Sequence, residues 1–259
     1  MNLYNNQTIP PQKNQQETSL MIDLTSQSKE LELIDIEPLD FNLTNAFLKD
    51  LERVNQLTMA YRPTLKAIEN ILRVKQTGPP QRSVKILDVG CGLGDTLRKI
   101  SQWARENNIS VDLTGLDINP MAKKAAQTAT PEGMKITYMS KNVFDESFQE
   151  TYDIIICSLF THHLDYQSLI KFIKWMTGRA KYGWFINDLH RHIIPYYFIK
   201  YFVRLLRLNR LILNDAPLSV ARSFSKSEWH KIIKEANVKG AKLTISWHWP
   251  FRYCVLCLI

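Results

Sequence analysis

The chain has 259 residues and a mass of 30.2 kDa, with 45% hydrophobic and 22% charged residues. This composition allows a sizeable buried core and excludes a wholly disordered, collagen-like or coiled-coil chain. The net charge of +8 hides an asymmetry: residues 1–60 carry nine Asp/Glu against four Lys/Arg, whereas residues 190–240 carry ten Lys/Arg against three Asp/Glu. Such a basic face can attract nucleic acid, anionic lipid or an acidic substrate, or it can simply be solvated.

The four cysteines are too few and too scattered for a disulfide framework. Cys254 and Cys257 have a metal-like spacing, but residues three apart in a strand point to opposite faces, and no second Cys/His pair accompanies them. We therefore expect buried thiols and no metal site. No stretch reaches roughly 18 uncharged apolar residues, and the polar N-terminus lacks the pattern of a secretory signal. A soluble, reducing, cytoplasmic setting is predicted.

The N-terminal third predicts a tail followed by helices. Residues 1–30 are rich in Asn, Gln, Ser and Thr without apolar periodicity, so we expect a disordered tail there. Apolar residues recur at helical spacing from Leu43, and Pro63 can begin a second helix. A Gly-Pro-Pro sequence then interrupts the pattern. It divides a helical cap over residues 31–79 from a main domain over residues 80–259.

Within the main domain, short apolar strands alternate with helical segments. Strands are predicted over 84–89, 111–116, 135–139, 152–157 and 182–186, with helices over 96–106, 120–128, 167–176 and 227–236. The chain ends in a predicted antiparallel pair, 242–248 and 253–259. This order is typical of an α/β fold with a doubly wound, mostly parallel seven-stranded sheet.

A helical insertion, about 193–240, follows the fifth strand and begins with a long helix predicted over 195–213. Three cations, Lys200, Arg204 and Arg207, share one stripe of this helix, and aromatic and leucine side chains cover the rest. The helix could pack over the strand ends as a lid that lines an aromatic pocket. It could also be an ordinary packing helix, or rest on an anionic membrane.

A glycine-rich turn at the end of the first strand carries the most information. Gly90, Gly92 and Gly94 allow close backbone approach to a ligand, and the next helix offers free N–H groups. Dinucleotide binding favours G-x-G-x-x-G, but here the third glycine comes one residue early. The carboxylates of Asp88 and Asp95 would repel a pyrophosphate. They suit a ligand with an ammonium and a sulfonium, and so favour S-adenosylmethionine.

Asp117 ends the second strand, where a carboxylate can accept both ribose hydroxyls. With this acid, the glycine motif in 84–94 and the fourth-strand motif in 152–164, the sequence resembles the small-molecule class I S-adenosylmethionine-dependent methyltransferases, over about 80–259. The resemblance implies a Rossmann-like fold and an N-terminal cap that closes over the cofactor. Many members carry Asp at the position of Asn142, whose carbonyl can still accept from the adenine amino group. The implied cofactor-binding residues are Asp88, Gly90, Cys91, Gly92, Gly94, Asp117, Ile118, Asn142, Val143 and Ser158.

Methyl transfer is an in-line displacement that needs alignment, water exclusion and, for an oxygen or acidic carbon, a base. His162 and His163 end the fourth strand, and His190 follows Asp188 at the end of the fifth. Each histidine could be a base or orienter, or be structural. Arg222 could bind an acidic group or pair with a surface carboxylate.

The segment after the fourth strand also argues against one substrate class. It lacks the Asn/Asp-Pro-Pro-aromatic turn of enzymes that methylate nucleic-acid amino groups, and it lacks a Pro-Cys nucleophile. We therefore predict an S-adenosylmethionine-dependent methyltransferase acting on O or C of a small hydrophobic or aromatic acceptor, such as a phenol, quinol or polyketide. Two alternatives stay open: an RNA methyltransferase that uses the basic C-terminal face, and a non-catalytic binding module. The sequence leaves the oligomeric state undetermined.

Overall fold

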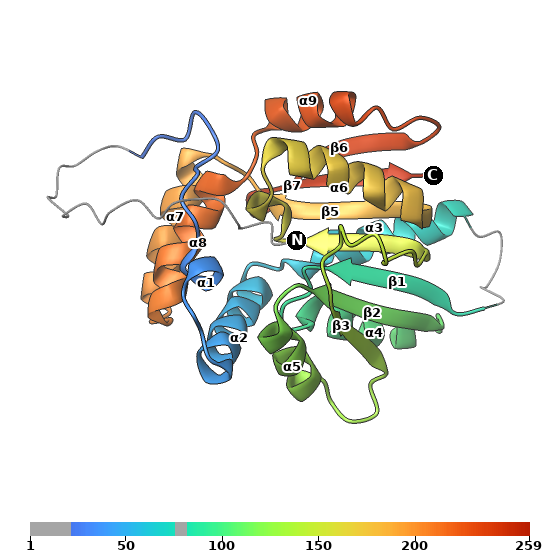
Figure 1. Ribbon diagram of the computed structural model, residues 1–259, viewed down its shortest axis with the longest axis horizontal. Helices are drawn as coiled ribbons and strands as arrows, with labels where there is room; N and C mark the ends of the chain where they lie inside the picture. The colour runs from blue at the N-terminus through green and yellow to red at the C-terminus, as the bar shows by residue number, and fades with distance from the viewer. Residues whose placement is uncertain (1–21, 76–81) are drawn as a thin grey trace, which may run out of the picture.

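A computed structural model describes residues 22–75 and 82–259 of the protein (Figure 1). Its seven-stranded sheet has the order β3-β2-β1-β4-β5-β7-β6, in which β1 to β5 are parallel and β7 and β6 run antiparallel to their neighbours. The strands are β1 Val84–Val89, β2 Val111–Asp117, β3 Ile136–Ser140, β4 Tyr152–Ser158, β5 Ala180–Leu189, β6 Lys242–His248 and β7 Arg252–Leu258. The predicted doubly wound, mostly parallel sheet is confirmed.

Helices cover both faces of this sheet because its buried strands send alternate side chains to opposite sides. On β4, Ile154 and Ile156 pack with α3 (Tyr61–Lys75) and α4 (Asp95–Glu106), whereas Ile155 and Cys157 pack with α6 (Tyr166–Arg179) and α9 (Lys226–Ala236). The same alternation separates the two C-terminal thiols. Cys254 and Cys257 are both buried, in different clusters, as the strand spacing predicts.

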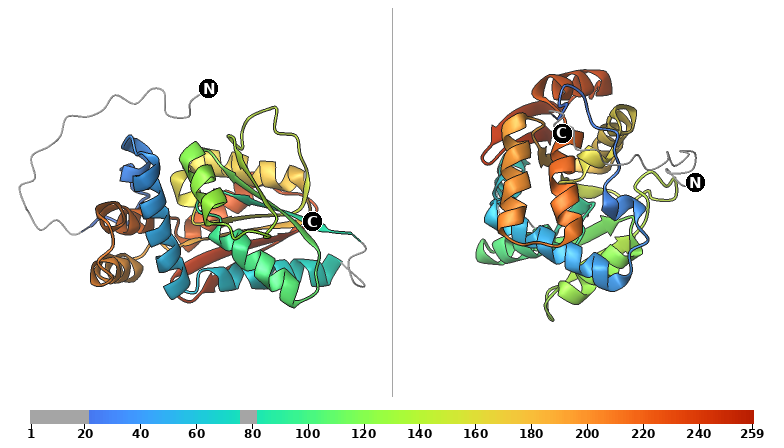
Figure 2. Two further views of the ribbon diagram at one scale, coloured as in Figure 1. Left: turned by 90° about the horizontal axis from the view of Figure 1, so that it is seen from below. Right: turned by 90° about the vertical axis from the view of Figure 1, so that its left-hand side faces the viewer.

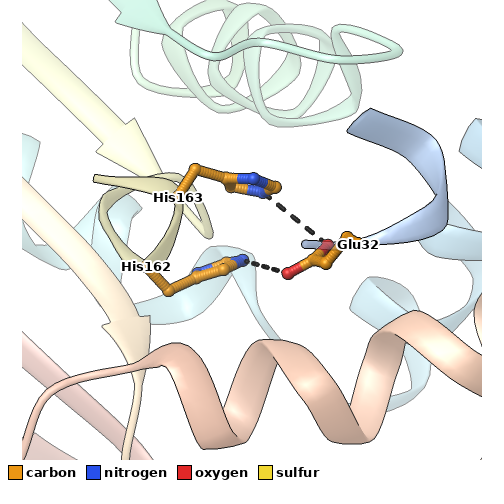
Figure 3. A group of neighbouring side chains, drawn as sticks. All are labelled: Glu32, His162 and His163. Atoms are coloured by element: carbon orange, nitrogen blue, oxygen red, sulfur yellow. Dashed lines mark ion pairs between the residues drawn. The ribbon is translucent and has the colours of Figure 1, made fainter. Parts of the chain in front are cut away.

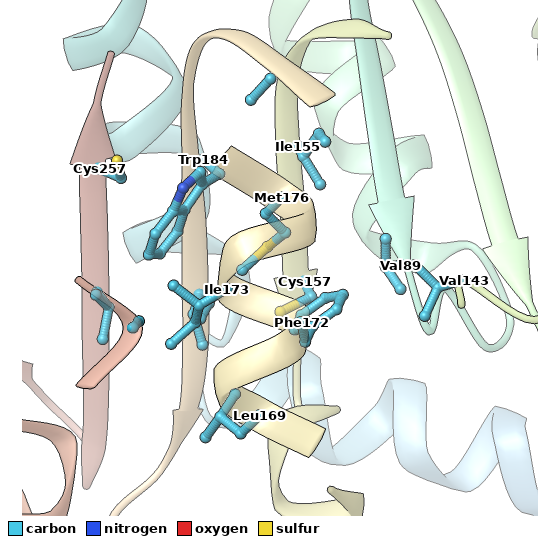
Figure 4. Packing of buried hydrophobic residues seen from close by; sticks show 14 of the residues in the cluster. Val89, Val143, Ile155, Cys157, Leu169, Phe172, Ile173, Met176, Trp184 and Cys257 are labelled. Atoms are coloured by element: carbon cyan, nitrogen blue, oxygen red, sulfur yellow. The ribbon is translucent and has the colours of Figure 1, made fainter. Parts of the chain in front are cut away.

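The core under α6 shows how tightly the sheet is held (Figure 4). Phe172, Ile173 and Met176 lie on the inner face of this helix and pack in the same buried cluster as Trp184 of β5. All four side chains are essentially inaccessible to water. Truncating one buried aromatic residue of this kind costs about 3–5 kcal/mol, so the packing of α6 against the sheet contributes strongly to the stability of the fold.

A second group of helices covers the carboxyl ends of the parallel strands. It comprises α1 (Leu33–Ile36), α2 (Phe41–Leu57), α5 (Pro120–Ala129), α7 (Ile193–Leu205) and α8 (Arg210–Arg222), with the short 3-10 helix η1 (Thr161–His163) beneath. Figures 1 and 2 show α1, α2, α7 and α8 together at one end of the molecule. Buried residues of α2, α5, α7 and α8 form a cluster of their own.

The single helix predicted over 195–213 is wrong, because the chain turns between α7 and α8. Arg207 has a left-handed backbone (φ 52°), and the Asn209 side chain caps α8 by accepting from the Ile212 amide at 3.1 Å. The helical lid is predicted to extend to about residue 240. In the structure only α7 and α8 lie at the strand ends, whereas α9 packs against α6 and is not part of a lid.

The N-terminal segment is more closely attached than its composition indicates. Residues 1–21 and 76–81, and with them most of the predicted tail and the boundary at residue 80, lie outside the described residues. Residues 22–30 lie against the fold: the Ser28 amide donates to Ala221 O at 3.0 Å, and Arg191 Nε donates to Leu24 O at 3.1 Å. Of the predicted cap, α3 packs on the sheet itself. None of the described helices is both long and apolar enough to span a bilayer.

Candidate active site

A cavity of about 1150 Å³ opens at the carboxyl ends of β1, β2 and β4. Its wall combines the glycine turn, the ends of β2 and β3, the 3-10 helix and the helices above them. Ligand sites for one small molecule usually enclose about 300–1,000 Å³, so this cavity has room for a cofactor and an acceptor side by side. The predicted site residues that line it are Gly90, Gly92, Asp117, Ile118, Asn142, Val143, His162 and His163.

Two positions of the turn after β1, Gly90 and Gly94, accept only glycine. Gly90 and Gly94 have φ values of 71° and 74°, and a Cβ at Gly90 would lie 2.6 Å from the Phe160 ring. At Gly94 a Cβ would collide with the Tyr138 hydroxyl. Both the left-handed backbone and the space around it therefore exclude a side chain. The turn leaves the backbone of Gly90 exposed to the cavity.

Asp117 joins the two halves of the predicted cofactor site. Its Oδ2 accepts from the Gly92 amide at 2.9 Å, and its Oδ1 accepts from the Asn119 amide at 2.9 Å. Burial raises the pKa of Asp117, while these two hydrogen bonds lower it. The carboxylate that ends β2 therefore lies beside the glycine turn that ends β1.

The glycine turn is also tied to the N-terminal helices through a buried carboxylate. Asp95, the first residue of α4, accepts from Tyr61 Oη at 2.6 Å and from Asn55 Nδ2 at 3.2 Å. Burial raises the pKa of Asp95 and that of Tyr61. These bonds hold the junction of α2 and α3 over the turn. The sequence marked these helices as a cap but did not indicate Asp95 as their anchor.

A buried acceptor in the cavity wall tests whether this end of the cavity fits S-adenosylmethionine. Asn55 lines the cavity, and its Oδ1 has no hydrogen-bond partner among the described residues; Asp88 Oδ1 is also unpaired, but Asp88 lies outside the wall. A buried acceptor without a partner costs free energy, and an ammonium donor would remove that cost. The residues present therefore fit a cationic ligand with an amino group.

Some predicted cofactor contacts do not reach the cavity. Asp88, Cys91, Gly94 and Ser158 are not among its lining residues. Ser158 Oγ lies 3.3 Å from Thr64 Oγ1 of α3, so its hydroxyl is used within the fold. The backbone turns after β4, and residues 159 and 160 line the cavity instead.

The adjacent histidines of the 3-10 helix form a buried polar cluster with Glu32 (Figure 3). Their Nε2 atoms lie 3.7 Å and 3.8 Å from the two Glu32 oxygens, for His162 and His163 respectively. On the opposite side of each ring, Nδ1 lies 2.8 Å from Asp188 Oδ1 in His162 and 3.0 Å from Asp35 Oδ2 in His163. Each imidazole is thus fixed by one carboxylate and turns its other nitrogen toward Glu32.

The pKa values of His163 and Asp188 in this cluster are shifted in opposite directions. Burial lowers the pKa of His163, but Glu32 and Asp35 outweigh it and bring the pKa to about 9. Burial raises the pKa of Asp188, but His162 and the surrounding hydrogen bonds bring it down to about 2. At neutral pH His163 is therefore protonated and Asp188 is ionised.

Glu32 and Asp35 are functional candidates that the sequence did not single out. The only signal was the acidic composition of residues 1–60. Among the described residues, atoms of Glu32, His162 and His163 lie within 4.8 Å of one another, close enough to share a metal ion. The carboxylates of Asp35 and Asp188 already account for the orientation of both imidazoles. The expectation of no metal stays a prediction.

Arg222 and His190 lie in other places than predicted. Arg222 is buried and donates to the backbone oxygens of Glu30 (2.8 Å), His162 (3.3 Å) and His163 (3.3 Å), so a surface ion pair is wrong. His190 does not line the cavity. Its ring packs against Tyr253 with centroids 4.5 Å apart, and burial lowers its pKa to about 4.

Much of the remaining cavity wall comes from the helices that cover the strand ends, and it mixes apolar side chains with polar ones such as Asp215 and Arg222 of α8. Phe47 and Leu48 of α2, with Phe198 and Ile199 of α7, are among its members. The outer side of α7 is apolar as well. Tyr201 and Leu205 are 62% and 79% exposed there, beside Arg204.

Part of the chain is similar in sequence to known proteins. Residues 86–183 match the sequence model of a methyltransferase domain. An uncharacterized protein of Rickettsia prowazekii (strain Madrid E) is 30% identical over 98 residues, which span 38% of this chain and 38% of that protein.

Three solved structures share the fold at low sequence identity. The plantazolicin methyltransferase BpumL in complex with SAH has a TM-score of 0.62 at 15% identity, covering 84% of this chain and 96% of that one. Human N-acetylserotonin methyltransferase in complex with SAM has a TM-score of 0.58 at 13% identity, and the match covers 85% of this chain and 56% of that one. An O-methyltransferase family protein from Burkholderia thailandensis has a TM-score of 0.59 at 14% identity, and the match covers 88% of this chain and 62% of that one.

The sheet order and the glycine turn at the end of β1 define the fold of a class I methyltransferase. The methyltransferase domain matched over residues 86–183, together with this fold, supports a class I S-adenosylmethionine-dependent methyltransferase with S-adenosylmethionine as its cofactor.

Proposed function

We propose that the protein transfers a methyl group from S-adenosylmethionine to an oxygen or carbon of a small hydrophobic or aromatic acceptor. The observation that carries this proposal is a cavity whose wall combines two kinds of surface. The glycine turn and Asp117 form one part of the wall, and apolar helix faces with the histidine cluster form another. A donor and an acceptor bound in one cavity can be aligned for in-line transfer.

The cofactor would lie along the ends of β1, β2 and β3. The cofactor supplies a methyl group on a sulfonium that needs no further activation. In this proposal Asp117 accepts from the ribose hydroxyls, and the segment around Asn142 contacts the adenine. The glycine turn lets the chain approach the cofactor closely, and the orphaned Asn55 Oδ1 accepts from its amino group.

His162 is the proposed base for a hydroxyl acceptor. Asp188 holds its Nδ1 at 2.8 Å, which leaves Nε2 to receive a proton from the cavity side. His163, with a pKa raised to about 9, is already protonated at neutral pH and would instead orient an acceptor oxygen as a donor. His190 is outside the cavity and has no part in the proposal.

Two findings favour a small molecule over RNA. Apolar side chains of α2 and α7 line part of the cavity, and two cations of the basic 190–240 segment, Arg191 and Arg222, are buried in hydrogen bonds to the fold. Guanidinium groups that are bonded to the fold in this way add nothing to a phosphate-binding surface. The basic surface is correspondingly weaker than the count of charges indicates.

Binding of S-adenosylhomocysteine to the full chain tests the cofactor half by calorimetry. Asp117→Ala removes two ribose contacts, and we expect about a tenfold to hundredfold weaker affinity, as for lost hydrogen bonds to a charged group. Asp112→Ala, at the exposed start of β2, is the matched control. An unchanged affinity in Asp117→Ala would remove this residue from the cofactor site.

Turnover with a panel of phenols and quinols tests the acceptor half. We expect S-adenosylhomocysteine to form with at least one member, and His162→Gln to lower the rate while cofactor affinity is kept. If no panel member reacts but S-adenosylhomocysteine binds, the non-catalytic binding module is favoured. Retention of RNA at low salt, lost at high salt, would favour the RNA substrate.

The peripheral membrane contact predicted for residues 195–213 is proposed for the outer face of α7. This helix carries exposed Tyr and Leu side chains beside Arg204 and contains no acidic residue. Aromatic rings flanked by cations suit an anionic bilayer surface. Co-sedimentation with anionic but not zwitterionic vesicles is expected, weakened by Leu205→Ser. Equal binding to both kinds of vesicle, or to neither, contradicts the proposal.

A further inference from the structure

A buried arginine in the cavity wall lacks a partner for its charge. Arg252, the first residue of β7, is 3% exposed and lines the cavity. Its Nη2 donates to Thr58 Oγ1 at 3.2 Å. Its Nε and Nη1 have no hydrogen-bond partner among the described residues. Almost every guanidinium so deeply buried is paired, because leaving it unpaired costs several kcal/mol.

The carboxylates of the fold do not fill this role. Burial lowers the pKa of Arg252, and Asp188 acts on it only through its charge. Asp188 already accepts from His162, Thr161 and the Leu189 amide. Since no carboxylate of the described residues bonds to the guanidinium, an anion supplied from the cavity would complete it.

The surroundings of Arg252 indicate which anion this is. Thr58, its hydrogen-bond partner, lies three residues after Asn55, so the two residues share one face at the end of α2. Asn55 lines the same cavity and has the orphaned acceptor Oδ1 described above. Thr58 thus links the guanidinium with unpaired donors to the helix turn that carries the unpaired amide oxygen. A carboxylate and an ammonium on one carbon, as in an α-amino acid, would satisfy both.

We propose that Arg252 binds the carboxylate at the amino-acid end of the cofactor, while Asn55 accepts from its ammonium. This inference rests on the proposed function, because it assumes that the cofactor occupies the glycine-turn end of the cavity. The proposal adds to the cofactor site a residue of β7, which lies far along the chain from the glycine turn. An N⁺–H···O⁻ contact is among the stronger hydrogen bonds in proteins, so it would fix the position of the sulfonium end.

The test compares two ligands by calorimetry on the full chain. S-adenosylhomocysteine carries the amino-acid end, whereas methylthioadenosine keeps the adenosine and thioether and lacks it. In Arg252→Met we expect about a tenfold to hundredfold weaker affinity for S-adenosylhomocysteine and an unchanged affinity for methylthioadenosine. Arg105→Met, on the exposed face of α4, is the matched control and should change neither. In Arg252→Lys, which keeps the charge, part of the preference for S-adenosylhomocysteine should remain.

The melting temperature without ligand separates binding from a purely structural role. Replacing an unpaired buried charge by an apolar side chain of similar volume should leave it unchanged or raise it. Equal weakening of both ligands with a lower melting temperature would overturn the proposal, since Arg252 would then only support the fold. Unchanged affinity of Arg252→Met for both ligands would overturn the proposal too. If the KM for an acidic acceptor were then raised in this variant, the anion that pairs with Arg252 would belong to the acceptor and not to the cofactor. Failure of the wild-type chain to bind either ligand would instead contradict the proposed function.

Discussion

Replacing Asp188 by asparagine tests the reasoning about the histidine cluster most directly. The side chain is almost fully buried, and it accepts from Thr161 Oγ1, from the His162 amide at 3.0 Å and from the Leu189 amide at 2.7 Å. It also fixes His162 Nδ1 at 2.8 Å. Asp188→Asn keeps the shape of the side chain, removes its charge and places an amide NH2 donor where the partners of Asp188 require an acceptor.

The expected loss follows from the ionisation of the carboxyl group. Burial raises the pKa of Asp188, and His162 with the hydrogen bonds more than offsets this, so that it lies at about 2 against an ordinary 3.8. This difference corresponds to about 2 kcal/mol of the free energy of unfolding at neutral pH, or roughly a thirtyfold change in the folded-to-unfolded ratio. Because the native pKa is the lower one, the contribution is complete above about pH 5 and is lost as the pH falls through about 2.

Urea unfolding of the wild type and of Asp188→Asn at several pH values between neutral and the acid limit of folding measures this. The gap in the free energy of unfolding should be about 2 kcal/mol at pH 7 and shrink toward acid. Asp112→Asn, exposed on β2, should show no such gap. A gap that is absent at pH 7, or one that keeps its size as the pH falls, would refute the assigned charge state of Asp188.

Three further changes probe the turn, the cap and the cluster. Gly90→Ala forces a side chain onto a left-handed backbone and should lower the free energy of unfolding by about 1–3 kcal/mol, measured by urea unfolding. Tyr61→Phe removes the 2.6 Å bond to Asp95 and should cost about 1–3 kcal/mol while weakening S-adenosylhomocysteine binding. Glu32→Gln should lower the pKa of His163, followed by NMR. Because the pKa of His163 is raised in the native state, its contribution to the free energy of unfolding is complete below pH 6.5 and is lost as the pH rises through about 9. In Glu32→Gln, the free energy of unfolding should fall less over this pH range.

Each of these variants has a matched control on the surface. Gly133→Ala lies in a left-handed turn with open space around it, so it separates backbone strain from the collision at Gly90. Tyr201→Phe and Glu106→Gln are exposed counterparts of the other two changes. Equal effects in a variant and its control would show that the buried contact is not responsible.

The strands illustrate what could be predicted from local pattern. The range 84–89 predicted for the first strand is that of β1, and the third strand differs from β3 by one residue at each end. Buried parallel strands are short continuous apolar runs between polar turns, which makes their limits visible in the sequence. β5 is longer than predicted, Ala180–Leu189, because its polar end, including Asp188, still pairs with β7.

The break between α7 and α8 could not be predicted in this way. The apolar pattern continues from Leu205 through Leu211, and no Gly or Pro interrupts it. The chain turns at Arg207, which takes a left-handed backbone, and the next residue, Leu208, is buried in the cluster that α2, α5, α7 and α8 share. Neither feature is encoded in the helical periodicity of the segment.

The sequence alone determined the sheet, the glycine turn and the acid at the end of β2, because each depends on residues that are neighbours along the chain or on parallel strands ending at one edge. Only the tertiary structure decided that Glu32 meets His162, that Asp188 holds the same imidazole, and that Arg252 lies unpaired in the cavity wall. These residues come from segments far apart in the chain. Their charges become significant only when folding removes them from water and leaves one another, or a ligand, as their partners.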